Sequence, residues 1–208
     1  IQDVSGNKVN SSLRIYATAS AGATLGGITD YAPISGSVTF VNLKLTGEAK
    51  AYTLTYSASG LISAVQNITN APGAATQISI AGSSTAVNDQ ALGLQPIVTV
   101  KDASGNTVTD STASITLTAT GASIGGTVTM NAVAGEADFD GLGVKLTGLV
   151  GAKTIRATSA PGGFTADLAV TLTYGTATRL AVSSATVSAT NRVVFAAQPT
   201  ITVQDVSG

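Results

Sequence analysis

An Asp-Val-Ser-Gly or Asp-Ala-Ser-Gly string occurs three times in this chain of 208 residues, at Asp3, Asp102 and Asp205. Asp3 and Asp102 are 99 residues apart, and Asp102 and Asp205 are 103 residues apart. A spacing of about 100 residues is the size of an independently folding domain, and repetition at that spacing indicates a tandem array. The chain is therefore expected to fold as successive copies of one small domain.

Further matches keep the same order along the chain. Phe40 matches Phe139 at a distance of 99 residues, Leu45-Thr46-Gly47 matches Leu146-Thr147-Gly148 at 101, and Gln95-Pro96 matches Gln198-Pro199 at 103. Such small drifts are typical of insertions in turns between strands. They predict a partial repeat over residues 1–73 that lacks the first strand and most of the second, a complete repeat over 74–176, and the start of a third over 177–208.

The residue types that are absent exclude several kinds of chemistry. The chain has no Cys, His or Trp, and its 10 Lys and Arg nearly balance its 11 Asp and Glu. These absences exclude disulfides, thiolate metal sites and His-based catalytic triads, and there is no basic stripe to bind nucleic acid. We expect a protein that is not an enzyme and needs no cofactor, although a carboxylate-only glycosidase stays open chemically.

No part of this sequence looks like a membrane anchor or an export signal. Its apolar residues alternate with Thr and Ser, so that no uninterrupted run reaches the length of a membrane span. The first ten residues, IQDVSGNKVN, lack the basic and then apolar pattern of a signal peptide. If the parent protein is exported, we expect its signal upstream of this sequence.

The complete repeat has the period-two pattern of strands that bury one face. Apolar residues alternate with Thr or Ser, and Gly-rich turns separate the segments at short, regular spacing. The pattern predicts seven strands near residues 77–81, 95–101, 113–119, 127–131, 136–140, 153–159 and 166–173. Seven short strands with such turns predict an all-β sandwich.

Individual residues carry further structural predictions. Pro96 and Pro199 are expected at the first position of their strands, where a missing N–H does least harm. Phe40 and Phe139 are the candidate inward anchors of their repeats. In the Asp-Ala-Ser-Gly-Asn string, Gly105 is expected to take a positive φ while the Asp carboxylate caps neighbouring N–H groups, which makes this a turn motif.

Two kinds of chemical site are weighed against ordinary surface residues. Asp138 and Asp140, with Asp102 nearby, are weak candidate oxygen ligands for calcium, but the sibling repeat has Thr39 and Val41 in their places. We therefore favour solvated carboxylates and predict no metal site. Lys145, which recurs as Lys44 in the first repeat, is in a position to cross-link with a carboxyl or amide side chain if it is buried, but a surface Lys that protects a strand edge is the favoured interpretation.

The string IVTVKDASGNTV, followed by ASITLTATG, a Gly-Gly turn, GEADFDGL and AKTIRATSA, resembles the bacterial immunoglobulin-like repeats of invasin and intimin type surface proteins. The resemblance covers the whole repeat. It implies tandem Greek-key immunoglobulin-like sandwiches in an exported, extracellular protein at the cell surface. It also implies a structural role as a stalk, fibre or surface layer.

Two alternatives remain open at the level of the sequence. The repeats are either structural or an adhesive module that binds carbohydrate or a host or cell-surface protein. The expected partners are neighbouring repeats or subunits of the same protein, head to tail, either in one long chain or by strand donation between separate subunits. Charge-poor strands rich in Thr and Ser favour such association, because little in them discourages contact between sheets.

Overall fold

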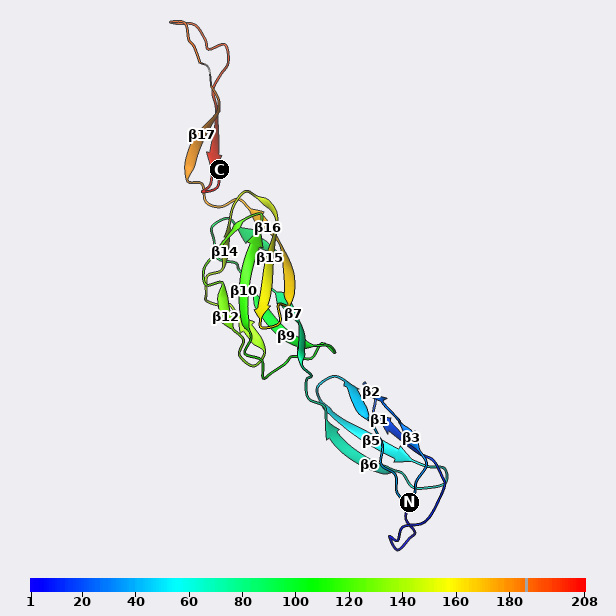
Figure 1. Ribbon diagram of the computed structural model, residues 1–208. Coiled ribbons are helices and arrows are strands. Elements are labelled where there is room, and N and C mark those ends of the chain that lie inside the picture. The colour runs from blue at the N-terminus through cyan, green and yellow to red at the C-terminus, as the bar shows by residue number, and fades with distance from the viewer. Residues whose placement is uncertain (186) are drawn as a thin grey trace. The chain divides into compact units, whose positions relative to one another are not determined.

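The computed structural model describes residues 1–185 and 187–208, which form strands and turns without any helix (Figure 1). The prediction of an all-β protein is thus confirmed, and the described residues contain no helix of the length and apolarity needed to cross a membrane. The chain divides into two compact units. The first holds Ile1–Ala74 with Asp102–Thr107, and the second holds Ala75–Lys101 with Val108–Gly208. Each unit is described by itself.

The complete repeat in unit 2 contains all seven predicted strands and three short ones. The strands are β7 (Ala75–Ala81), β8 (Thr85–Val87), β9 (Ile97–Asp102), β10 (Ser114–Thr120), β11 (Ser123–Gly125), β12 (Thr129–Asn131), β13 (Glu136–Asp138), β14 (Lys145–Thr147), β15 (Gly151–Ala160) and β16 (Thr165–Thr173). The sequence did not predict β8, β11 and β14, whose three residues each become a strand only by pairing, β8 with β16 and β11 with β14.

These strands form three sheets. The largest has the order β12-β10-β15-β16-β8, a second has the order β13-β9-β7, and β11 pairs with β14. All pairs with a described register are antiparallel except β16 with β8. The pairing leaves β7 and β9 on a different sheet from β10, β15 and β16.

One apolar core holds these sheets together. In β10, Ile115 and Leu117 are buried and lie opposite Ser159 and Ala157 of β15, whereas the intervening Thr residues face outward. Val98 and Val100 of β9 enter the same cluster from the other sheet. Each such side chain contributes about 1.5–3 kcal/mol by leaving water, so the core is the main source of stability in unit 2.

Unit 1 contains equivalents of the largest sheet and of the short β11–β14 pair. Its strands are β1 (Ile15–Ala19), β2 (Ala23–Gly26), β3 (Asp30–Tyr31), β4 (Lys44–Gly47), β5 (Ala51–Ser57) and β6 (Ala64–Thr69). The order β3-β1-β5-β6 matches β12-β10-β15-β16, and the pair β2-β4 matches β11-β14. Within the described residues, unit 1 has no sheet equivalent to β13-β9-β7.

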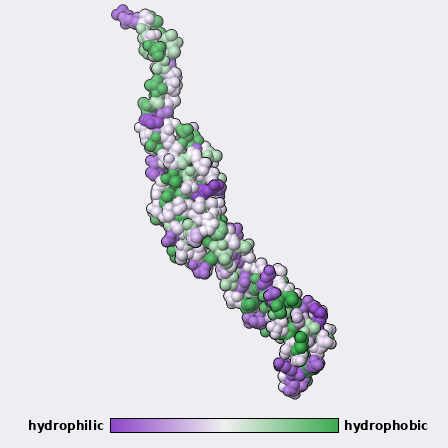
Figure 2. Space-filling model, in the orientation of Figure 1, coloured by the Kyte–Doolittle hydropathy of each residue, from purple (hydrophilic) through white to green (hydrophobic). Residues whose placement is uncertain are grey.

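The third copy of the repeat is represented by a hairpin of β17 (Arg179–Ser184) and β18 (Thr200–Gln204). These strands match β7 and β9 in sequence and belong to unit 2. Apolar side chains reach the surface of this hairpin, where Figure 2 shows hydrophobic residues beside polar ones. The hairpin is therefore formed without the second sheet that covers its equivalents.

The structure refines the predictions for single residues. Pro96 and Pro199 each stand one residue before their strand, not at its first position, and the carbonyl of Pro96 accepts the N–H of Phe139. Phe139 is fully buried, as predicted for an inward anchor. Phe40 is only half-buried and packs against Tyr56 with ring centroids 5.6 Å apart. The difference follows from the sheet that unit 1 lacks.

Candidate functional site

The Asp102 loop is a turn held by its own carboxylate. Asp102 Oδ1 accepts the N–H groups of Ser104 at 2.8 Å and Asn106 at 2.9 Å. Gly105 has a φ of 84°, a conformation that glycine adopts without steric cost. The predicted turn, with a capping carboxylate and a left-handed glycine, is confirmed.

The same carboxylate also binds the segment that leads out of the preceding repeat. Asp102 Oδ2 accepts the N–H of Gly73 at 2.8 Å, and Gly73 lies between β6 and β7. By sequence the loop lies within the second repeat, at the end of β9, but by packing it belongs to unit 1. We call this bond between the loop aspartate and the linker glycine the linker clamp.

A second linker clamp occurs one repeat later. Asp205 Oδ2 accepts the N–H of Gly175 at 2.9 Å and the side-chain amide of Asn88 at 2.8 Å, while Oδ1 accepts the N–H of Ser207 at 2.9 Å. Gly175 follows β16 as Gly73 follows β6, and the two glycines are 102 residues apart. The clamp is thus a property of the repeat and not of one loop.

The first copy of the loop provides an internal comparison. Asp3 Oδ1 accepts the N–H groups of Ser5 and Asn7 at 3.0 and 2.9 Å, the same two turn bonds that Asp102 makes. No linker glycine bonds to Asp3 among the described residues, and Asp3 is exposed, whereas Asp102 and Asp205 are buried. Burial of the carboxylate therefore accompanies the clamp and not the turn.

Neighbouring amides reinforce each linker clamp with different residues. In the first, Asn106 Oδ1 accepts the N–H of Ala49 at 2.8 Å and its Nδ2 donates to the carbonyl of Gly47 at 3.1 Å. In the second, Asn88 Oδ1 accepts the N–H of Gly148 at 3.0 Å. Gly47 and Gly148 occupy the same turn in successive repeats, so both clamps reach the same place in the preceding repeat.

The electrostatic consequence is the same at both clamps. The N–H of Gly73, followed by the Asn106 side chain, lowers the pKa of Asp102 from 3.8 to about 2. The N–H of Gly175, followed by the Asn88 side chain, lowers the pKa of Asp205 from 3.8 to about 2. Hydrogen bonds to the charged form favour that form, so both carboxylates remain ionised well below neutral pH.

The structure gives each calcium candidate an ordinary role. Asp138 and Asp140 are exposed, and Asp138 Oδ1 accepts the N–H of Asp140 at 2.9 Å within their turn. The oxygens of Asp102 are engaged in the turn and the clamp. Across residues 1–185 and 187–208, no three Asp, Glu, His or Cys side chains form a group that could hold a metal ion.

Lys145 is not buried. Its Nζ lies 2.7 Å from Asp89 Oδ1, and the two side chains are 40% and 42% exposed. The Thr147 hydroxyl also donates to Asp89 Oδ1, at 3.3 Å. This is a half-exposed ion pair beside a strand, which differs from the buried setting that a cross-link requires.

The sequence analysis identified the aspartate of the linker clamp, but it missed the linker glycines that bind it and the reinforcing Asn88. Gly73 and Gly175 recur at the spacing of the repeat, a few residues after its last strand, and this was the signal that could have identified them. Asn88 gave no comparable signal, because its role depends on a loop 117 residues away.

A scan against models of protein families finds no match to this sequence, and neither does a search of the curated proteins.

Proposed function

We propose that this chain is a structural segment of tandem immunoglobulin-like, Greek-key β-sandwich repeats in an exported bacterial surface protein. It acts there as part of a stalk, fibre or surface layer, outside the cell and without catalysis. The observation that carries this proposal is the recurrence of the linker clamp at Gly73 and Gly175. A repeat that ties down the linker leaving its predecessor, as at Gly73 and at Gly175, restricts bending of that linker, which is the requirement of a protein that extends or bears load.

The residues of the linker clamp also explain why the loop recurs while surface residues vary. A buried carboxylate has to be paired with donors, and here the donors come from the loop and from the linker. Removal of the carboxylate would leave the Gly73 N–H without its acceptor. The Asp-x-Ser-Gly string is thus under a structural constraint that ordinary surface turns do not have.

The adhesive alternative has weaker support in the described surface. Sugar recognition by stacking needs aromatic rings that share one face. Tyr16 and Tyr31 are both exposed on neighbouring strands, but Tyr31 is registered with Ile15 and therefore lies on the face opposite Tyr16. No described observation favours adhesion over a structural role.

The test uses the full chain and the Asp102→Asn substitution. Hydrogen exchange of the linker peptide around Gly73 is expected to accelerate, whereas the peptide around Gly175 in the same sample keeps its rate and serves as a reference. Asp110→Asn, at an exposed position in a turn, is the matched control and is expected to leave both linkers unchanged. Equal exchange at Gly73 in wild type and Asp102→Asn would refute the clamp.

Two further measurements test the proposed location and the proposed mechanical role. Antibodies raised against the chain are expected to label the surface of intact cells, and single-molecule pulling on the full chain is expected to show a linker that yields at lower force in Asp102→Asn. Saturable binding on a glycan array, or a measurable hydrolase activity, would contradict the structural role.

A further inference from the structure

We propose that the peptide bond between Asp140 and Gly141 is a site of spontaneous chemical modification, at which Asp140 converts to isoaspartate through a cyclic imide. The reaction takes place within one chain and needs only water, so it does not depend on the proposed function. It adds a carbon atom to the main chain of unit 2, in a turn beside the buried Phe139.

The reaction rearranges atoms that the chain already holds. The amide nitrogen of Gly141 attacks Cγ of the Asp140 side chain, a C–N bond forms, and the amide hydrogen and the carboxyl hydroxyl group leave as water. A water molecule then opens the imide. Attack at the former side-chain carbonyl restores Asp140, whereas attack at the main-chain carbonyl leaves the chain linked through the side chain, as isoaspartate.

The sequence favours this reaction at one place. Asp140 is the only Asp in the chain that is followed by Gly, and no Asn is followed by Gly. Because Gly has no Cβ, no side chain on the following residue hinders the approach of its nitrogen to the Asp side chain. The Asp140–Gly141 pair is therefore the candidate site.

Both reacting groups of this pair are free in the folded protein. Among residues 1–185 and 187–208, no group donates a hydrogen bond to the Asp140 carboxylate, and the Gly141 N–H donates to no acceptor. Both residues are exposed. The Asp140 N–H donates to Asp138 Oδ1 at 2.9 Å, but this bond leaves the reacting nitrogen and carboxyl group unoccupied.

The turn around the pair leaves room for the imide ring. The Leu142 N–H donates to the carbonyl of Phe139 at 3.0 Å, Gly141 has a φ of 70°, and Asp140 has no positive φ, a combination that makes this a type II turn. The central peptide of such a turn takes no part in the closing hydrogen bond. A Cβ added at Gly141 would meet no atom within 4 Å, so the surroundings do not oppose rotation of this peptide.

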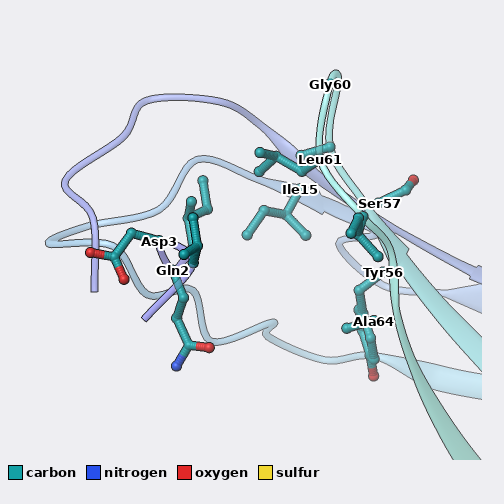
Figure 3. A pocket seen from close by; sticks show the side chains of 12 residues that line it. Gln2, Asp3, Ile15, Tyr56, Ser57, Gly60, Leu61 and Ala64 are labelled. Atoms are coloured by element: carbon teal, nitrogen blue, oxygen red, sulfur yellow. The ribbon is translucent and has the colours of Figure 1, made fainter. Parts of the chain in front are cut away.

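No other Asp in the described part of the chain has both groups free. Asp110 is exposed, but the N–H of the next residue, Ser111, donates to the carbonyl of Val108 at 2.9 Å. Asp3 lines the hollow of unit 1 shown in Figure 3, and its carboxylate accepts two N–H groups of its own turn. The other carboxylates are all hydrogen-bonded: Asp30, Asp89, Asp102, Asp138, Asp167 and Asp205.

The equivalent turn of unit 1 shows that the fold does not require this pair. Val41 and Asn42 stand in the places of Asp140 and Gly141, and Asn42 has a φ of 56°. The same turn thus forms with a different residue at the first position. Substitutions of Asp140 are therefore suitable tests, because they leave the turn intact.

Isomerisation is expected to strain unit 2 and not unit 1. The Phe139 N–H donates to the carbonyl of Pro96 at 3.0 Å, which fixes one end of the turn. The carbonyl of Leu142 accepts the Thr127 N–H at 3.0 Å, which fixes the other end. With both ends fixed, an added main-chain carbon breaks the closing bond between Phe139 and Leu142 and disturbs the buried anchor.

The first experiment is incubation of the full chain at neutral pH and body temperature, followed by peptide mapping with mass spectrometry. Isoaspartate is recognised by its retention and fragment ions, since the mass does not change. We expect it to accumulate at Asp140 and at no other Asp, at a rate of the same order of magnitude as in a free peptide of residues 136–144. A folded chain that keeps Asp140 unmodified while the free peptide isomerises overturns the proposal.

Two substitutions at Asp140 test the chemistry. Asp140→Glu keeps the charge but would need a larger ring, so we expect no accumulation. Asp140→Asn loses ammonia in place of water and is expected to deamidate as fast in the folded chain as in its free peptide. Asp110→Asn is the matched control, and the bonded Ser111 N–H is expected to slow it in the folded chain relative to its own peptide. Equal slowing of both Asn variants would overturn the argument from free groups.

The last measurement compares aged with fresh chain by hydrogen exchange during urea unfolding. We expect the midpoint of β10 peptides to fall in proportion to the isoaspartate content, whereas β5 peptides keep their midpoint and aged Asp140→Glu shows no shift. An unchanged β10 midpoint in modified chain would contradict the expected strain. Failure here leaves the Gly73 exchange test untouched, because Asp102→Asn changes the linker clamp and not this turn.

Discussion

The pair Phe40 and Phe139 offers a comparison of one residue in two environments of the same fold. Phe139 is fully buried in the core of unit 2. Its truncation in Phe139→Ala is expected to cost about 3–5 kcal/mol, as large-to-small changes at closed core sites do. Phe40 is only partly buried, so that Phe40→Ala loses part of the transfer free energy of a Phe side chain and one ring contact with Tyr56, about 2–3 kcal/mol in all and less than Phe139→Ala.

The two losses have to be measured separately for each unit. Hydrogen exchange during urea unfolding resolves them, with peptides from β10 reporting on unit 2 and peptides from β5 reporting on unit 1. We expect Phe139→Ala to shift the β10 midpoint and leave β5 unchanged, and Phe40→Ala to produce the smaller shift in β5. Equal losses of free energy at the two positions would refute the argument that unit 1 lacks the covering sheet.

Two further predictions concern the linker clamp and a turn. Because the folded pKa values of Asp102 and Asp205 are about 2, below the ordinary 3.8, both linker clamps are intact above pH 3.8 and are lost as the pH falls toward 2. In NMR spectra the amide shifts of the two linker glycines should titrate with midpoints near pH 2, and midpoints near 3.8 would contradict the clamp. Gly126 has a φ of 91°, and a Cβ there would collide with the backbone at Gly143. In thermal unfolding followed by circular dichroism, Gly126→Ala should therefore cost clearly more than Gly105→Ala, which meets open space and pays only the left-handed strain of about 1–2 kcal/mol; similar losses would contradict this.

The strands of the central repeat could be predicted because their pattern is local. In β10, apolar and Thr residues alternate, and this alternation alone separates the buried face from the exposed one. The Asp102 turn was predictable for the same reason, since its capping bonds span two and four residues. Short strands such as β8 were missed because their pairing is decided by β16, far along the chain.

In the candidate site, too, the local features could be predicted from the sequence and the long-range contacts could not. The sequence identified Asp102 as a capping residue, but the bond to Gly73 joins residues 29 positions apart and left no local pattern. The weak calcium hypothesis rested on Asp138 and Asp140 lying two residues apart, on the same side of a predicted strand. The structure places them in an exposed turn in which one carboxylate caps the other residue's amide.

The sequence by itself determined that the chain is all-β and that it repeats with a domain-sized period, because strand periodicity and turn residues act over a few positions. Only the tertiary structure decided which copies of a residue are buried. Phe40 and Phe139, or Val203 and Val100, have matching sequence contexts and differ in exposure, since burial depends on whether a second sheet lies across from them. The linker clamps are likewise a tertiary feature, because Asp102 and Asp205 accept the N–H groups of glycines that lie 29 and 30 residues before them in the sequence.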